Sequence, residues 1–170
     1  MTAPAAADAA PPGLARRFAA FLYEGVLLFG LIFFAGFLYT VLTRQQHALQ
    51  GRTGLGAFLF LVLGLYFVGF WVHSGQTLAM KTWHLRVMTA DGRPLGLGRA
   101  TARYLLSWLW FLPALVSVWA LGLRGSAAVV GSLTAGIAGY VLIARLHPHR
   151  QFLHDAICGS RVVTQLPLRS

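Results

Sequence analysis

Four long runs of hydrophobic residues dominate the chain, and short polar segments separate them. The runs cover residues 18–42, 55–73, 104–123 and 127–144. A helix needs about 20 apolar residues to cross the hydrocarbon core of a bilayer. In lipid, such a run must satisfy its backbone hydrogen bonds internally, which favours helix. The pattern therefore predicts an all-α membrane protein built as a bundle of four transmembrane helices.

The segments outside these runs are short. Residues 1–13 are rich in Ala and Pro and predict a disordered tail. Residues 14–163 form the predicted transmembrane domain, and residues 164–170 a C-terminal tail. Between the second and third runs, Leu85–Thr89 favours a strand and Asp91-Gly92 is typical of a tight turn. We therefore expect a short cytoplasmic β-turn loop between helices two and three.

Composition agrees with the membrane class. The 170 residues are 57% hydrophobic and 11% charged, whereas about 25% of the residues of an average soluble protein are charged. The net charge of +10 would also suit a nucleic-acid-binding protein. That class places a charged face on a soluble body, which this composition cannot provide, so we expect no nucleic-acid partner.

The distribution of charge predicts the orientation in the membrane. Two Lys or Arg residues precede the first run, five lie between the second and third runs, and four follow the fourth. The loop between the first and second runs has two, and the loop between the third and fourth runs has one. Because basic loops stay in the cytoplasm, we expect both termini there. We also expect this basic face to contact anionic lipid headgroups. A ligand or anion site at the Asp91-Gly92 turn is the alternative.

Glu24 is a carboxylate inside the first predicted membrane helix, where an acid is costly and normally faces a partner. Arg17 precedes it by seven residues, so the two share a helix face. One interpretation is a cation or proton site. The other is a buried pair with Arg99 or Arg103 that fixes how the first and third helices pack.

The region after the fourth run contains His147, His149, His154 and Cys158. His154 and Cys158 are four residues apart, a spacing that can hold a metal on a helix. Pro148 interrupts any regular helix through the first two histidines, and we expect structural roles in preference to a metal site. The single cysteine excludes an intrachain disulfide. No catalytic constellation or phosphate-binding loop is present, so we expect no enzyme activity and no cofactor.

Small residues recur every four positions in the fourth run, at Gly131, Ala135 and Gly139. Such rows let helix backbones approach closely. They indicate either a homo-oligomer formed through the fourth helix or close packing within the chain.

Three pieces of the chain, in this order, resemble the RDD family of small bacterial integral membrane proteins. The first is the Ala-Arg-Arg-Phe segment at residues 15–18 with an acid at position 24. The second runs from Gly75-Gln76-Thr77 through Asp91 to Arg103, and the third is Leu153-His154-Asp155 followed by residues 159–163. The resemblance spans nearly the whole chain.

The resemblance implies that Arg17, Glu24 and Asp155 are the marked positions, with Glu24 replacing an aspartate. It also implies a place in the bacterial inner membrane, and transport, with cation–proton exchange at the buried carboxylate. The alternative function is a membrane module without transport activity, such as a scaffold, an assembly factor or a lipid-binding accessory protein. We expect Glu24 to be buried against a basic residue and Asp155 to be paired. The remaining candidate residues lie in the cytoplasmic loop: Gln76, Lys81, Arg86 and Asp91.

Overall fold

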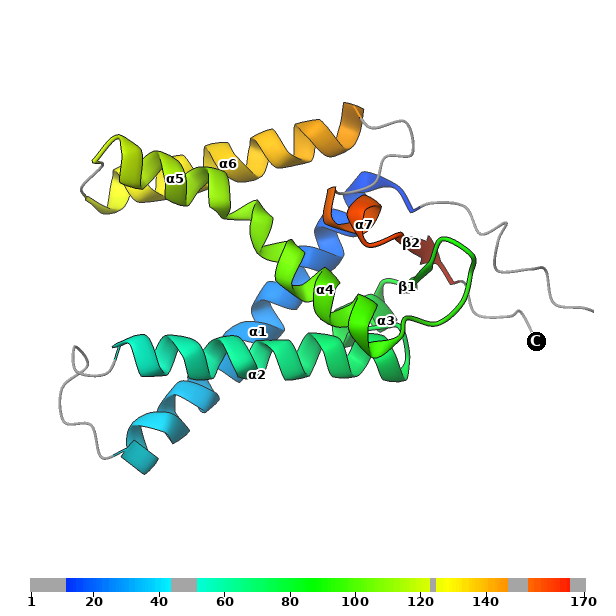
Figure 1. The fold of residues 1–170 in the computed structure, drawn as a ribbon, viewed down its shortest axis with the longest axis horizontal. Coiled ribbons are helices and arrows are strands. Elements are labelled where there is room, and N and C mark those ends of the chain that lie inside the picture. Colours follow the sequence, from blue (N-terminus) through cyan, green and yellow to red (C-terminus); the bar gives the residue numbers. More distant parts are fainter. Residues whose placement is uncertain (1–11, 44–51, 123–124, 147–152, 166–170) are drawn as a thin grey trace, which may run out of the picture. The chain divides into compact units, whose positions relative to one another are not determined.

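The computed structural model describes residues 12–43, 52–122, 125–146 and 153–165 (Figure 1). The chain is mostly helical and divides into two compact units. Unit 1 contains Met1–Ala100 and Val162–Ser170, and unit 2 contains Thr101–Arg161. Most of the two predicted tails, together with His147 and His149, lies outside the described residues.

Two long helices, α1 (Leu14–Thr43) and α2 (Arg52–His73), form most of unit 1. Both are long and apolar enough to cross a membrane. Large apolar side chains on both helices are exposed, for example Phe29, Phe33 and Leu65, each at 70% or more. A surface of this kind is unfavourable in water and suits contact with lipid. The first two predicted membrane helices therefore coincide with observed helices.

The buried residues of α1 lie on one stripe of the helix. Arg17, Ala20, Glu24 and Ala35 are each less than 9% exposed. Their spacing of three, four and eleven residues follows the helical repeat, so α1 turns one narrow face inward. The helices α2 and α3 (Leu78–Thr82) contact α1, and the two alanines leave room for a close approach.

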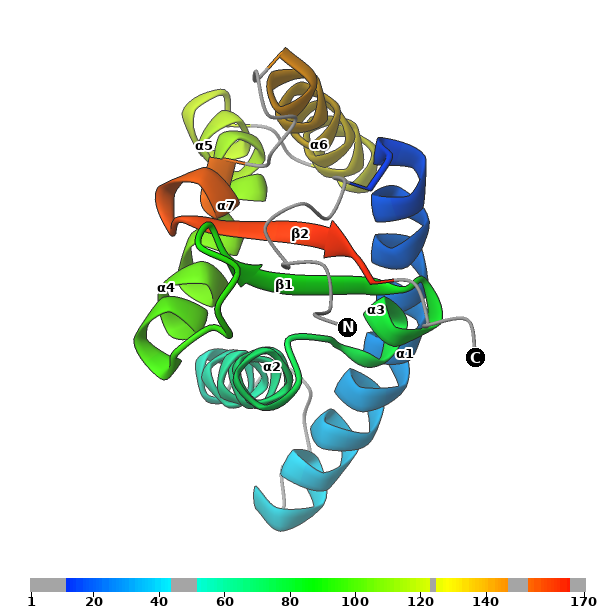
Figure 2. The same ribbon diagram turned by 90° about the vertical axis from the view of Figure 1, so that its right-hand side faces the viewer.

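A small sheet completes unit 1. Strand β1 (Leu85–Thr89) pairs with β2 (Ser160–Thr164), as Figure 2 shows. The carbonyl of His84, just before β1, accepts a hydrogen bond from Gln165 N, just after β2, so the strands are antiparallel. Leu85 and Val87 of β1 and Val162 and Val163 of β2 are buried. The prediction of an all-α bundle with a short β-turn loop is thus corrected by a two-stranded sheet whose second strand comes from near the C-terminus.

Unit 2 begins within α4 (Leu97–Ser107) and continues through a 3₁₀ turn, η2 (Trp108–Trp110), into α5 (Leu112–Ala120). The third predicted run, residues 104–123, which we expected to bend at Pro113, therefore contains the end of α4, η2 and α5, with a break near residue 111. The break has a local cause. Pro113 lies in the first turn of α5, where its missing N–H is tolerated, whereas inside a longer helix it would remove a hydrogen bond.

The helices α5 and α6 (Ser126–Leu146) pack against each other, and a short helix, α7 (Leu153–Ile157), follows. The fourth predicted run, residues 127–144, therefore lies within one helix of 21 residues. Among the described residues, α1 and α2 meet the length and composition of a span. The four-span arrangement stays a prediction.

Candidate functional site

Glu24 lies at the centre of a polar cluster in unit 1. Its side chain is 7% exposed. Tyr66 of α2 donates a hydrogen bond from its hydroxyl to Glu24 Oε1 at 2.6 Å. The hydroxyl of Thr77, which is fully buried, donates to Glu24 Oε2. Two neutral hydroxyl groups from two different elements therefore occupy both oxygens of the carboxylate.

Thr77 also begins α3. It is the N-cap residue of that helix, and its Oγ1 accepts a hydrogen bond from Met80 N at 3.3 Å. A threonine hydroxyl has one proton to donate and two lone pairs that accept. The proton is used on Glu24 and a lone pair on the helix terminus, so one side chain serves both partners.

The segment before Thr77 is held against β1 by two hydrogen bonds. Gln76 donates from Nε2 to Leu85 O at 2.6 Å, and Gly75 O accepts from Val87 N at 2.7 Å. These bonds help to fix the position of Thr77 next to Glu24, because the two residues before Thr77 are hydrogen-bonded to β1. The loop candidate Gln76 thus has a positioning role in the structure.

Gly75 is required by the backbone conformation at this point. Its φ is +71°, a region that side chains other than hydrogen rarely tolerate. A Cβ placed there would also lie 2.8 Å from Val87 O and 3.0 Å from Arg86 Nε. The glycine therefore allows the chain to turn from α2 into α3 with β1 alongside.

We expected a basic side chain next to Glu24, and the described contacts of its carboxylate are instead the hydroxyls of Tyr66 and Thr77. The physical reason is that the N-cap of α3 and one face of α2 bring two donors to the acid. Arg17 is buried on the same stripe of α1. Arg99, one expected partner, is exposed, as are Lys81 and Asp91.

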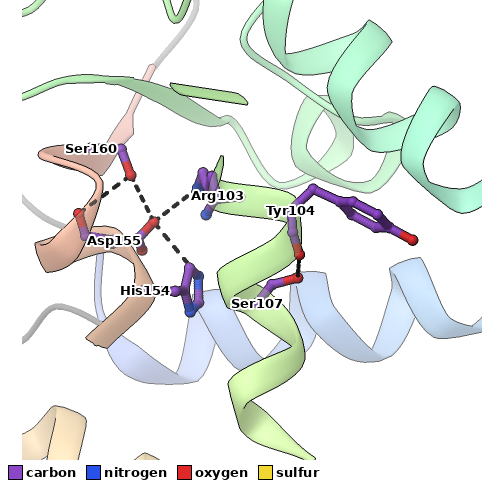
Figure 3. Close-up of polar contacts among 6 residues, drawn as sticks. All are labelled: Arg103, Tyr104, Ser107, His154, Asp155 and Ser160. Carbon is purple, nitrogen blue, oxygen red and sulfur yellow. Dashed lines mark hydrogen bonds and ion pairs between the residues drawn. The ribbon is translucent and has the colours of Figure 1, made fainter. Parts of the chain in front are cut away.

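A second polar cluster surrounds Asp155 in unit 2 (Figure 3). Arg103 Nε lies 2.9 Å from Asp155 Oδ1, and Ser160 Oγ donates to the same oxygen at 3.1 Å. His154 Nε2 is 3.6 Å from it. Asp155 is fully buried and Arg103 is 5% exposed. The acid thus ties α4, α7 and the start of β2 together.

The chemistry of the two clusters differs. Asp155 sits in an ion pair, which neutralises its charge and fits a structural role. The described donors to Glu24 are uncharged, and carboxylate and hydroxyl oxygens are ligands that small hard cations prefer. A proton can also bind the carboxylate directly. The Glu24 cluster is therefore the better candidate for binding chemistry.

No three His, Cys, Asp or Glu side chains in the described ranges are arranged to hold a metal ion. His154 contacts Asp155, and Cys158 is partly buried, which raises the pKa of its thiol. A raised pKa disfavours the thiolate, the form that ligates metals.

Sequence reasoning missed Tyr66 and Thr77 as members of the site. Tyr66 is a polar residue within an apolar run, and Thr77 belongs to the Gly75-Gln76-Thr77 segment already singled out. Neither position reveals from sequence alone that it reaches an acid on α1. The signal that could have found Thr77 is the pattern of an N-cap residue at the start of a short helix.

The model of the RDD family matches residues 11–159. No curated protein and no protein of known structure matches the chain significantly.

Proposed function

Because the chain belongs to the RDD family, we propose that it is a multi-pass membrane protein in which the Glu24 carboxylate binds a proton or a small cation during transport. The observation that carries this proposal is the buried carboxylate of Glu24 with a hydroxyl donor on each oxygen. An acid within a membrane helix is expensive to keep, and such residues commonly mark ion or proton pathways.

The arrangement around Glu24 suits reversible binding. Each hydroxyl can turn about its C–O bond, so Tyr66 and Thr77 can donate to an ionised carboxylate or present an oxygen lone pair to a cation. A guanidinium in the same place would hold the carboxylate ionised and compete with any other cation. Neutral donors leave the negative charge of Glu24 available to the transported ion.

Flux in proteoliposomes tests the proposal. The purified chain would be reconstituted with a pH-sensitive dye inside the vesicles, and proton movement would be followed after a sodium or potassium gradient is imposed. We expect wild-type vesicles to exchange cations for protons and Glu24→Gln to abolish the exchange. Glu24→Asp keeps the negative charge and should retain part of it.

The matched control is Tyr23→Phe, which alters the neighbouring exposed residue of α1 and should leave flux unchanged. Wild-type flux no faster than that of empty vesicles, or equal flux in wild type and Glu24→Gln, would refute the transport role.

We also propose four spans with both termini in the cytoplasm of a bacterial cell, in its inner membrane. The support is the excess of Lys and Arg before the first run, between the second and third, and after the fourth. Reporter domains fused after residue 170 and within residues 44–51 test it. The first fusion should be active only as a cytoplasmic reporter and the second only as an exported one. The opposite result would reverse the orientation.

A second candidate function is a lipid-binding module without transport activity. Residues 75–103 contain five basic residues and one acid, and Lys81 Nζ lies 6.0 Å from the ring centre of Phe70, one turn before the end of α2. This places a positive charge near the end of a membrane-length helix, where anionic headgroups lie. Trp83 and Leu97 nearby in sequence are exposed apolar residues.

Lipid composition separates the two functions. For a lipid-binding module, the thermal stability in vesicles containing phosphatidylglycerol should exceed that in phosphatidylcholine alone. The difference should shrink in Lys81→Gln combined with Arg99→Gln, two exposed positions. A module would show this lipid dependence with no flux in any variant.

A further inference from the structure

Thr77 links the carboxylate of Glu24, in the membrane-length helix α1, to the short helix α3 that follows α2. Its hydroxyl proton is donated to Glu24 Oε2, and its oxygen accepts the N–H of Met80. The side chain is fully buried. A change at Glu24 Oε2 therefore acts directly on the hydroxyl of Thr77.

The protonation and ligation states of Glu24 place different demands on this hydroxyl. An ionised carboxylate accepts from Thr77, as observed. A carboxyl group protonated on Oε2 must donate its own hydrogen, so Thr77 would have to accept it and turn its proton elsewhere. A cation bound to Glu24 likewise requires an oxygen lone pair from Thr77. In both cases the second lone pair of Oγ1 can still accept the N–H of Met80, but the hydroxyl proton loses its acceptor on Glu24. A buried donor without an acceptor costs free energy, which destabilises the position of Thr77 and with it the cap of α3.

The effect would extend beyond α3, because the neighbours of Thr77 are bonded to β1. Gln76 holds Leu85 O and Gly75 holds Val87 N, at 2.6 and 2.7 Å. The helix α3 has five residues, which is too short to be stable by itself. Its order therefore depends on the cap and on contacts with α1 and β1.

We propose that Thr77 couples the occupancy of Glu24 to the order of α3 and of the β1 strand that follows it. The inference rests on the proposed function, since it takes Glu24 to alternate between an ionised state and a proton- or cation-bound state. With Glu24 ionised, Thr77 donates to it and α3 is capped. With Glu24 neutralised, the cap weakens and the segment from α3 into β1 loosens.

Hydrogen–deuterium exchange of the full chain in lipid vesicles tests the coupling. Glu24→Gln represents the neutral state, because an amide of the same size offers one acceptor oxygen and one amino group. Backbone exchange would be measured for the peptide covering residues 79–84. Loss of a helix cap should speed exchange there about fivefold. Residues 126–139 of α6, in the other unit, serve as the internal reference.

A double-mutant comparison separates coupling from a simple structural role. Thr77→Val removes the hydroxyl at equal size and should speed exchange at residues 79–84 by itself. Adding Glu24→Gln to Thr77→Val should then change nothing further. Thr77→Ser restores the hydroxyl and should restore the response to Glu24→Gln.

Two results would overturn the coupling. One is exchange at residues 79–84 that is the same in wild type and Glu24→Gln. The other is a Glu24→Gln effect that persists in the Thr77→Val background or is shared equally by residues 126–139. The flux assay on the same vesicles keeps the two proposals distinct. Lost flux with unchanged exchange refutes the coupling alone, and changed exchange with no wild-type flux refutes the transport role alone.

Discussion

Tyr66 donates a hydrogen bond to Glu24 at 2.6 Å and so joins α2 to α1 at a carboxylate. The two residues are 42 positions apart, and each lies in a helix long and apolar enough to cross a membrane. In such surroundings a polar group satisfied by a neighbouring helix replaces the contact that water would make elsewhere. The bond therefore sets how the two helices are rotated toward each other.

Removal of the Tyr66 hydroxyl should destabilise this helix pair. A hydrogen bond to a charged group contributes about 1.5–3 kcal/mol, and polar contacts between membrane helices contribute less on average. We expect Tyr66→Phe to lower the free energy of unfolding by about 1 kcal/mol. Denaturant titration in mild detergent measures it. Tyr23→Phe, at an exposed tyrosine of α1, should have no effect, and equal loss in both variants would contradict the role of the bond.

Substitution of Gly75 should be more damaging than its size indicates. Gly75→Ala introduces a Cβ at φ +71° and 2.8 Å from Val87 O, and the backbone carbonyl cannot move without breaking its strand. A left-handed conformation alone costs a residue with a side chain about 1–2 kcal/mol. We expect at least that loss in the free energy of unfolding. Gly98→Ala, where no atom lies within 4 Å of the added Cβ, should be neutral.

The parts of the fold that sequence reasoning anticipated are those governed by local pattern. The runs at residues 18–42 and 55–73 are strongly apolar, with Glu24 as their one acidic residue, and they lie within α1 and α2. The β-branched and turn-forming residues from Leu85 to Gly92 likewise coincide with a strand and a turn closed by Gly92 N and Thr89 O.

What escaped prediction depends on contacts between distant residues. Strand β2 is five residues long, and its partner β1 is far away in sequence. Its composition alone therefore does not predict a strand. In the third run, Pro113 indicates an interruption, but hydropathy does not show that the helix before it begins at Leu97 or that a 3₁₀ turn joins the two helices. At the site, Glu24 was identified by its charge, whereas Tyr66 and Thr77 became visible only through the fold.

Loss of the Asp155 carboxylate should unfold unit 2. Asp155→Ala would remove the carboxylate that pairs with Arg103 Nε and that accepts from Ser160 Oγ. Breaking a buried ion pair by removing one member costs about 3–5 kcal/mol, a large part of the stability of a domain. We expect low yield or a strongly reduced melting temperature.

Two further variants locate the cause of that loss. Arg103→Lys keeps the charge without the planar fork and should be intermediate in stability. Asp91→Ala, at an exposed acid, should change the free energy of unfolding by less than about 0.5 kcal/mol. A melting temperature for Asp155→Ala equal to that of Asp91→Ala would contradict the structural role of the pair.

The thiol of Cys158 should react slowly in the folded protein. Burial raises the pKa of this thiol, Arg103 lowers it and Asp155 raises it again, with burial the largest contribution. Alkylation requires the thiolate, so at a given pH below the pKa the folded protein contains less of the reactive form than the unfolded chain does. The rate of maleimide labelling can be measured by mass spectrometry between pH 7 and pH 10. We expect the curve of rate against pH to lie at higher pH for the folded protein than for the protein in denaturant.

The same shift has a consequence for stability. Between the pKa of the unfolded thiol and the higher pKa of the folded one, the native state binds more protons, so the free energy of unfolding falls as pH rises. Cys158→Ser should reduce this slope at alkaline pH by the contribution of the thiol. Labelling profiles that coincide in the folded and denatured states, or an alkaline slope that is equal in wild type and Cys158→Ser, would show that the thiol titrates as it does in water.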